Sequence, residues 1–163
     1  MRKIGNIRRA VSHAVMIAAL VALAACSNTK NPLESGAPAV PGSTQDFVVN
    51  AGDRVFFTTD SAELTPQARE TLEKQVLWLK KYAHYAIRIE GHADERGTRE
   101  YNIALGARRA TTVRNYLVGQ GIDAGRLKTL SYGKERPVAV CDDISCWSQN
   151  RRAVTVISGQ GAS

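Results

Sequence analysis

The stretch "GHADERGTREYNIALGARRA" covers residues 91–110 and joins a predicted strand to a predicted helix. Before it, residues 85–91 alternate apolar and polar side chains, as a strand with one buried face does. Within and after it, apolar residues recur every three or four positions, which predicts a helix from about residue 99 to residue 118, ended by two glycines. This strand-to-helix unit indicates a domain in which helices pack on a sheet.

The flanking segments supply the other elements. Thr65 and Pro66 form an N-cap followed by a first-turn proline, which predicts a helix to about Tyr82. The remaining predictions are strands at 54–59, 127–132 and 153–157, a possible short strand at 47–49, and an irregular segment from 133 to 152. This β-α-β-α-β-β order predicts an α/β fold of the α+β sandwich type, with two main helices packed on one mixed sheet.

The first residues predict export. Residues 1–25 combine four basic residues, no acidic residue and a twelve-residue apolar run, the pattern of a secretory signal peptide. The run is too short to cross a membrane core, which needs about 20 residues. The sequence "LAAC", ending at Cys26, resembles the lipobox of bacterial lipoproteins. That resemblance implies a lipid on Cys26 after cleavage, and Ser27 resembles the next residue of lipoproteins sent to the outer membrane.

Composition divides the rest of the chain. Residues 26–44 are rich in proline and glycine and are predicted to form a flexible tether. Residues 45–158 have the size and composition of one globular domain, and 159–163 form a predicted disordered tail. The whole chain carries +7, but without residues 1–25 it has 18 Lys and Arg against 15 Asp and Glu, a net charge of +3. Nucleic acid is therefore not an expected partner.

Two cysteines remain once Cys26 carries lipid. Cys141 and Cys146 form an even pair in an oxidising compartment, which favours a disulfide over two free thiols. A metal site needs further ligands, and their segment contains no histidine. No metal or other cofactor is expected.

A stripe of mixed chemistry lies beside the apolar face of the second helix, in which Gly106 is expected to permit close packing. Thr98, Asn102, Leu105 and Arg109 step by four, three and four residues, so they share one side. Asp94 lies just beyond the preceding strand, where α/β proteins commonly bind ligands. An aspartate holds an ammonium group and an arginine holds a carboxylate, so the pattern suits a zwitterionic amino-acid side chain. The alternative is a structural ion pair between Asp94 and Arg109.

Three segments extend the interpretation. "GHADERGTREYNIALGARRA", "SYGKERPV" and "WSQNRRAVTVI" together resemble the OmpA C-terminal-like domain family, and within it the peptidoglycan-associated lipoproteins of the Tol–Pal system. The resemblance implies non-covalent binding of the peptidoglycan stem peptide through meso-diaminopimelate. It further implies anchoring of the outer membrane, TolB and other Tol proteins as partners, and a role in envelope integrity and constriction at division. The implied ligand residues are Asp94, Arg109, Asn102, Leu105, Thr59 and Asp60.

Other interpretations of the residues remain open. A structural or adhesive surface lipoprotein needs no occupied ligand site. A peptidoglycan-active enzyme would need a reactive grouping, yet His84 and His92 show no HExxH spacing and no activated nucleophile accompanies them. Trp78 and Trp147 are expected to be packing residues, and Arg151 is expected to anchor a loop.

Overall fold

The structure is a computed structural model that describes residues 39–159 of the chain. The predicted signal peptide, the lipidation site at Cys26 and most of the predicted tether lie outside these residues, as does the chain from residue 160 onward. Within the described part, no helix combines the length and the apolar character that crossing a bilayer requires.

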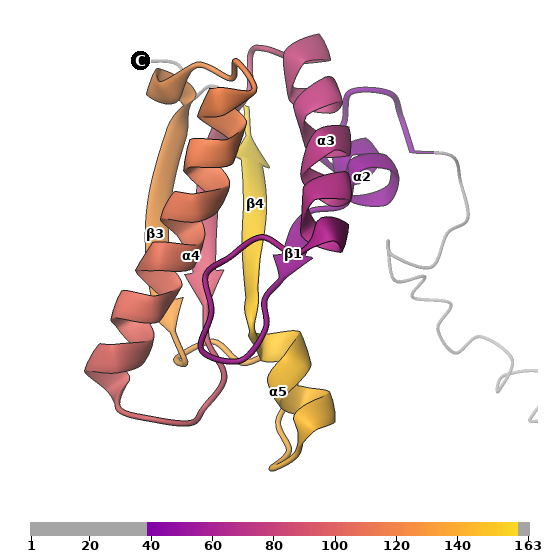
Figure 1. The fold of residues 1–163 in the computed structure, drawn as a ribbon. Helices are drawn as coiled ribbons and strands as arrows, with labels where there is room; N and C mark the ends of the chain where they lie inside the picture. Colours follow the sequence, from indigo (N-terminus) through magenta and orange to yellow (C-terminus); the bar gives the residue numbers. More distant parts are fainter. Residues whose placement is uncertain (1–38, 160–163) are drawn as a thin grey trace, which may run out of the picture. The chain divides into compact units, whose positions relative to one another are not determined.

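Four strands form one mixed sheet with the order β1-β4-β2-β3 (Figure 1). The strands are β1 (Arg54–Phe56), β2 (Ala86–His92), β3 (Leu127–Gly133) and β4 (Arg152–Ser158). The β2–β3 pair is parallel, whereas β4 runs antiparallel to both β1 and β2. The last strand of the chain therefore inserts between the first two.

Two long helices, α3 (Pro66–Lys81) and α4 (Arg99–Gly119), cover one face of the sheet (Figure 1). The Thr65 hydroxyl accepts a hydrogen bond from the Ala68 N–H, which confirms the predicted cap, and Thr98 caps α4 in the same way. Between helices and sheet lies a core whose most buried members include Phe47, Val55, Leu72, Leu79, Ile87, Ile89, Val113 and Leu117. The predicted fold class is confirmed.

Two glycines set the distance between α4 and the sheet. A Cβ atom on Gly91 of β2 would overlap the main-chain carbonyl of Gly106 in α4. A Cβ atom on Gly106 would in turn collide with the Ser131 hydroxyl, which donates a 2.7 Å hydrogen bond to the Ile103 carbonyl. The prediction that Gly106 permits close packing is confirmed, and the contact brings the N-terminal half of α4 over the end of β2.

One strand prediction was wrong, and another strand was predicted too long. Residues 47–49 are not a strand but part of a π-helix, η2 (Phe47–Ala51), in which Phe47 and Ala51 are buried while Val48 is exposed. A short apolar run does not distinguish these two structures. The strand predicted at 54–59 ends at Phe56 because its register partner, Arg152, is the first residue of β4.

The segment 133–152 is not wholly irregular. It contains α5 (Ile144–Asn150), whose N-cap Asp143 accepts a 2.7 Å hydrogen bond from the Ser145 N–H. The structure joins Cys141 to Cys146 by a disulfide, with their Cα atoms 5.6 Å apart. The remaining short elements are the helices α2 (Thr44–Asp46) and η3 (Ala124–Arg126).

Contacts of the folded domain begin inside the range predicted as tether. The buried Asp46 carboxylate accepts hydrogen bonds from the Gly42 N–H and the Trp78 indole, each 2.8 Å long. The Tyr85 hydroxyl donates to the Gly42 carbonyl over 2.6 Å. These bonds fasten the chain's entry into the domain to α3 and to the start of β2, and Trp78 packs in the core as predicted.

Candidate ligand-binding site

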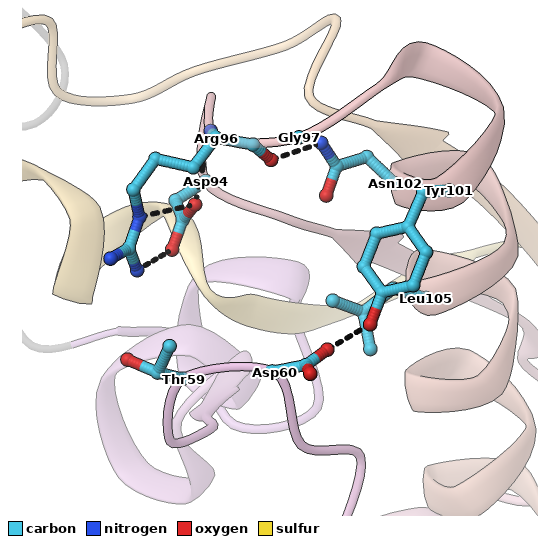
Figure 2. Close-up of a pocket in the computed structure, with 8 residues that line it drawn as sticks. All are labelled: Thr59, Asp60, Asp94, Arg96, Gly97, Tyr101, Asn102 and Leu105. Atoms are coloured by element: carbon cyan, nitrogen blue, oxygen red, sulfur yellow. Dashed lines mark hydrogen bonds and ion pairs between the residues drawn. The ribbon is translucent and has the colours of Figure 1, made fainter.

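A cavity of about 290 Å³ lies where β2 runs into α4 (Figure 2). This is near the lower end of the range of about 300–1,000 Å³ for ligand sites, so it fits one amino-acid side chain rather than a polysaccharide strand. Five of the six ligand residues predicted from the sequence line it, and Arg109 does not. The lining residues are Thr59, Asp60, Asp94, Arg96, Gly97, Tyr101, Asn102 and Leu105.

The loop after β2 places Asp94 in the lining of the cavity. The Ala93 N–H continues the pairing with β3 by donating to the Gly133 carbonyl, so Asp94 follows immediately beyond the sheet. The Asp94 carboxylate accepts a 3.2 Å hydrogen bond from the Arg96 N–H, which tightens the turn. From α4, the Asn102 amide donates to the Arg96 carbonyl over 2.7 Å. Asn102 therefore fixes the loop that carries the acid.

Asp94 is 7% exposed and pairs with two arginines. Arg96 contacts both carboxylate oxygens, with Nε–Oδ1 at 3.1 Å and Nη2–Oδ2 at 2.7 Å, and Arg151 Nη1 lies 3.3 Å from Oδ2. Burial by itself raises the pKa of Asp94, but the hydrogen bonds and charges of Arg96, with a further bond from Arg151, hold it below its ordinary value. The carboxylate is therefore ionised at neutral pH.

The alternative of a direct Asp94–Arg109 ion pair was wrong. Among the described residues, the acid pairs with Arg96 and Arg151, and Arg109 makes a different set of contacts. Arg151 also donates from Nε to the Phe57 carbonyl over 3.1 Å. It thus anchors the loop after β1, as expected, and contacts the same Asp94 oxygen, Oδ2, as Arg96 Nη2.

Arg109 is fully buried, one helical turn beyond Leu105 on α4. Its guanidinium donates to three main-chain carbonyls: Ser61 from Nε at 2.8 Å, His92 from Nη1 at 2.7 Å, and Thr58 from Nη2 at 3.2 Å. A guanidinium has five N–H donors, so two are left over.

The partners of Arg109 are neutral, so its positive charge is poorly compensated. Burial lowers its pKa to about 10, against a smaller opposing effect of Asp94. The group therefore remains cationic at neutral pH. A desolvated cation bonded only to neutral oxygens attracts an anion strongly, because the low local dielectric weakens its screening.

A hydrogen bond between Tyr101 and Asp60 closes the opposite side of the cavity. The Tyr101 hydroxyl donates to the Asp60 carboxylate, joining the loop after β1 to α4 (Figure 2). Asp60 is the one non-glycine residue of the described part with a positive φ, at 55°. Aspartate tolerates this conformation better than most residues, and the hydrogen bond helps to hold it there.

Arg96, Gly97 and Tyr101 were missed by the sequence analysis. Gly97 and Tyr101 precede Leu105 at steps of four, so they form a row beside the stripe that was recognised. Arg96 follows Asp94 by two residues, the spacing of an aspartate turn. These two spacings place all three residues near the site, but an arginine, a glycine and a tyrosine also suit solvent-exposed positions.

Trp147 of α5 supports the site from outside the cavity lining. The Arg96 guanidinium lies over the Trp147 ring, 4.2 Å from its centroid, and the Trp147 indole N–H donates to the Glu95 carboxylate over 2.6 Å. Trp147 is half-buried and contacts a residue of the site, so it does more than fill the core. The disulfided residue Cys146 immediately precedes it.

The histidines considered for an enzyme lie apart. His84 precedes β2 and is exposed, whereas His92 ends that strand and is buried. Over residues 39–159, no three side chains among His, Cys, Asp and Glu are grouped so as to hold a metal ion.

Comparison with known proteins gives consistent matches. The pattern of the OmpA family matches residues 56–151. A peptidoglycan-associated lipoprotein of Mesorhizobium japonicum is 58% identical, covering 97% of this chain and 99% of the relative. The protein of the same name from Agrobacterium fabrum is 61% identical over 86% of this chain and 84% of its own. The crystal structure of the peptidoglycan-associated lipoprotein from Burkholderia pseudomallei matches with a TM-score of 0.63 and 40% identity, covering 65% of this chain and 90% of that one.

Proposed function

The chain belongs to the OmpA family, and from that membership we propose that it is an outer-membrane lipoprotein that binds peptidoglycan non-covalently. The relatives in M. japonicum and A. fabrum are named for association with peptidoglycan. Their similarity extends over most of both chains, so the proposal concerns the whole protein and not only its folded domain.

One observation carries the proposal: an ionised acid lines a cavity of amino-acid size, and an under-compensated buried cation is bonded to the loop that forms part of the same lining. Asp94 offers a carboxylate to an ammonium group, and Arg109 has two N–H donors beyond those given to carbonyls. The side-chain end of meso-diaminopimelate carries an ammonium and a carboxylate on one carbon. We assign the first group to Asp94 and the second to Arg109.

The other predicted residues complete the site. Thr59, Asp60, Asn102 and Leu105 line the same cavity and supply a hydroxyl, a carboxylate, an amide and an apolar contact. Because Arg109 lies beneath the loop that it fastens, the ligand carboxylate reaches it when that loop moves. The Asp60–Tyr101 hydrogen bond is the contact that must loosen.

The proposed anchor is a lipid on Cys26, with residues 26–44 connecting it to the domain in the periplasm. Several acyl chains hold a protein on a membrane, since each buried methylene contributes about 0.8 kcal/mol. Such a protein links the outer membrane to the wall, and we propose TolB and the other Tol proteins as partners in envelope integrity and in constriction during division. The same names speak for binding without turnover, because they describe an association and no reaction.

The test is binding of soluble stem peptides that end in meso-diaminopimelate or in lysine, measured by calorimetry. Lysine lacks the second carboxylate, so the protein is expected to prefer the diaminopimelate peptide. Asp94→Asn should weaken that binding by about 1.5–3 kcal/mol, the range for hydrogen bonds to charged groups. Equal affinity for the two peptides would refute the assignment of the carboxylate to Arg109, and no affinity for either would refute the function.

A further inference from the structure

Asp94, the carboxylate assigned to the ligand ammonium, is already paired with Arg96. The Arg96 guanidinium contacts both oxygens of Asp94, at 3.1 and 2.7 Å, in a side-on geometry that one ammonium group cannot reproduce. Arg96 itself lines the cavity, and its side chain is 41% exposed. It therefore stands between the solvent and the carboxylate that a ligand has to reach.

A second surface also holds Arg96. Its guanidinium lies 4.2 Å from the centre of the Trp147 ring, and the Glu95 carboxylate fixes that ring through the indole N–H. The disulfide between Cys141 and Cys146 braces the helix that presents Trp147. When Arg96 leaves Asp94, the indole face still retains it nearby through a cation–π contact.

From these contacts we propose that Arg96 is a specificity-determining residue that makes the site select ligands with a zwitterionic side chain over ligands whose side chain is only cationic. This inference rests on the proposed function, because it takes Asp94 as the ammonium partner. In the free protein the Arg96 guanidinium pairs with the Asp94 carboxylate, and a ligand ammonium group displaces it. Arg96 moves aside, staying on Trp147, and contributes an unpaired positive charge beside the ligand.

Charge explains the selectivity. Asp94 already lies between Arg96 and Arg151, and Arg109 is buried close by. A ligand with only an ammonium adds another cation to this group and leaves the displaced Arg96 without a partner. A zwitterion brings its own carboxylate, which pairs with the cations that the exchange leaves over. Removing Arg96 should therefore favour the purely cationic ligand most.

The experiment compares Arg96→Gln with the wild-type protein, each purified from membranes in detergent, using the diaminopimelate and lysine stem peptides as probes. The wild type should prefer diaminopimelate, and Arg96→Gln should reduce that preference by about tenfold, mainly through tighter binding of the lysine peptide. Arg99→Gln is the matched control, because it removes an exposed arginine that pairs with Glu135 outside the cavity. It should leave the preference unchanged.

Each other result is decisive. If Arg96→Gln weakens the binding of both peptides equally, Arg96 is an ordinary contact. If it changes the binding of neither, the arginine takes no part in recognition. Both outcomes overturn the inference while the proposed function stands. If the wild type binds neither peptide, the proposed function fails and the inference fails with it. A second readout is tryptophan fluorescence, which should change on binding as Arg96 shifts over Trp147. That change should be lost in Trp147→Phe, which leaves only Trp78 to report.

Discussion

The Arg109 Nη1 group donates a 2.7 Å hydrogen bond to the main-chain oxygen of His92, the last residue of β2. The same guanidinium fastens the carbonyls of Thr58 and Ser61 in the loop after β1. Arg109 thus sets the position of both chain segments that supply the cavity, besides its proposed contact with a ligand. A loss of binding on its replacement has to be separated from a loss of folding.

Arg109→Ala should destabilise the domain. The substitution leaves three buried carbonyls without their donor and opens a cavity, which should cost about 2–4 kcal/mol. Urea denaturation followed by circular dichroism measures this. Arg108→Ala, one position away and exposed, should change stability little. An unchanged midpoint for Arg109→Ala would mean that the carbonyls find other partners and that the residue serves binding alone.

Gly106→Ala should be destabilising although alanine is the better helix former. Its Cβ would collide with the Ser131 hydroxyl and the Gly91 carbonyl, so α4 must move off the sheet, at a cost of about 1–3 kcal/mol. Gly119, at the end of the same helix, has nothing within 4 Å of the position of an added Cβ. Gly119→Ala should therefore stabilise by about 0.5–1 kcal/mol. Equal effects in denaturant would argue against the proposed close contact at Gly106.

His92 should make the domain less stable in mild acid. Burial, with the nearby charges of Arg152 and Arg136, lowers the pKa of His92 from 6.5 to about 4. The unfolded chain therefore takes up the proton first, so the contribution of the neutral ring is complete above pH 6.5 and is lost as the pH falls toward 4. Allowing for partial solvent screening, the loss is about 2 kcal/mol.

Unfolding free energies at pH 7.5 and pH 4.5 measure this effect. His92→Gln should lack that part of the pH dependence, because it has no group to protonate. His84→Gln, in the exposed segment before β2, should keep the wild-type pH dependence. If the glutamine variant at position 92 loses as much stability on acidification as the wild type, other groups account for the acid sensitivity.

The Cys141–Cys146 bridge should contribute a moderate amount to stability. It closes a short loop with a sequence separation of 5, for which chain entropy predicts about 2 kcal/mol. A reductant should lower the unfolding temperature of the wild type but not that of the Cys141→Ser, Cys146→Ser double variant. Because Cys146 lies in α5, the loss of stability should appear first as faster hydrogen exchange in that helix.

Local patterns in the sequence were enough to predict the main elements. Three predictions rest on spacings of a few residues: the N-cap at Thr65, the helix over 99–118 and the role of Gly106. Such spacings determine local backbone structure in the same way wherever the segment lies in the fold. The lining of the cavity by Asn102, Leu105 and Asp94 follows from the same periodicity and from the resemblance to the family.

Only the tertiary structure decided which groups the charged side chains contact. Arg151 reaches Asp94 across 57 positions of sequence, and Arg109 reaches Ser61 across 48. Those meetings depend on β4 inserting between β1 and β2, a strand order that no local pattern encodes. The sequence by itself determined the chemical groups at this end of the sheet. Long-range packing decided which carboxylates and carbonyls each arginine contacts, because electrostatic interactions depend on distance in space and not along the chain.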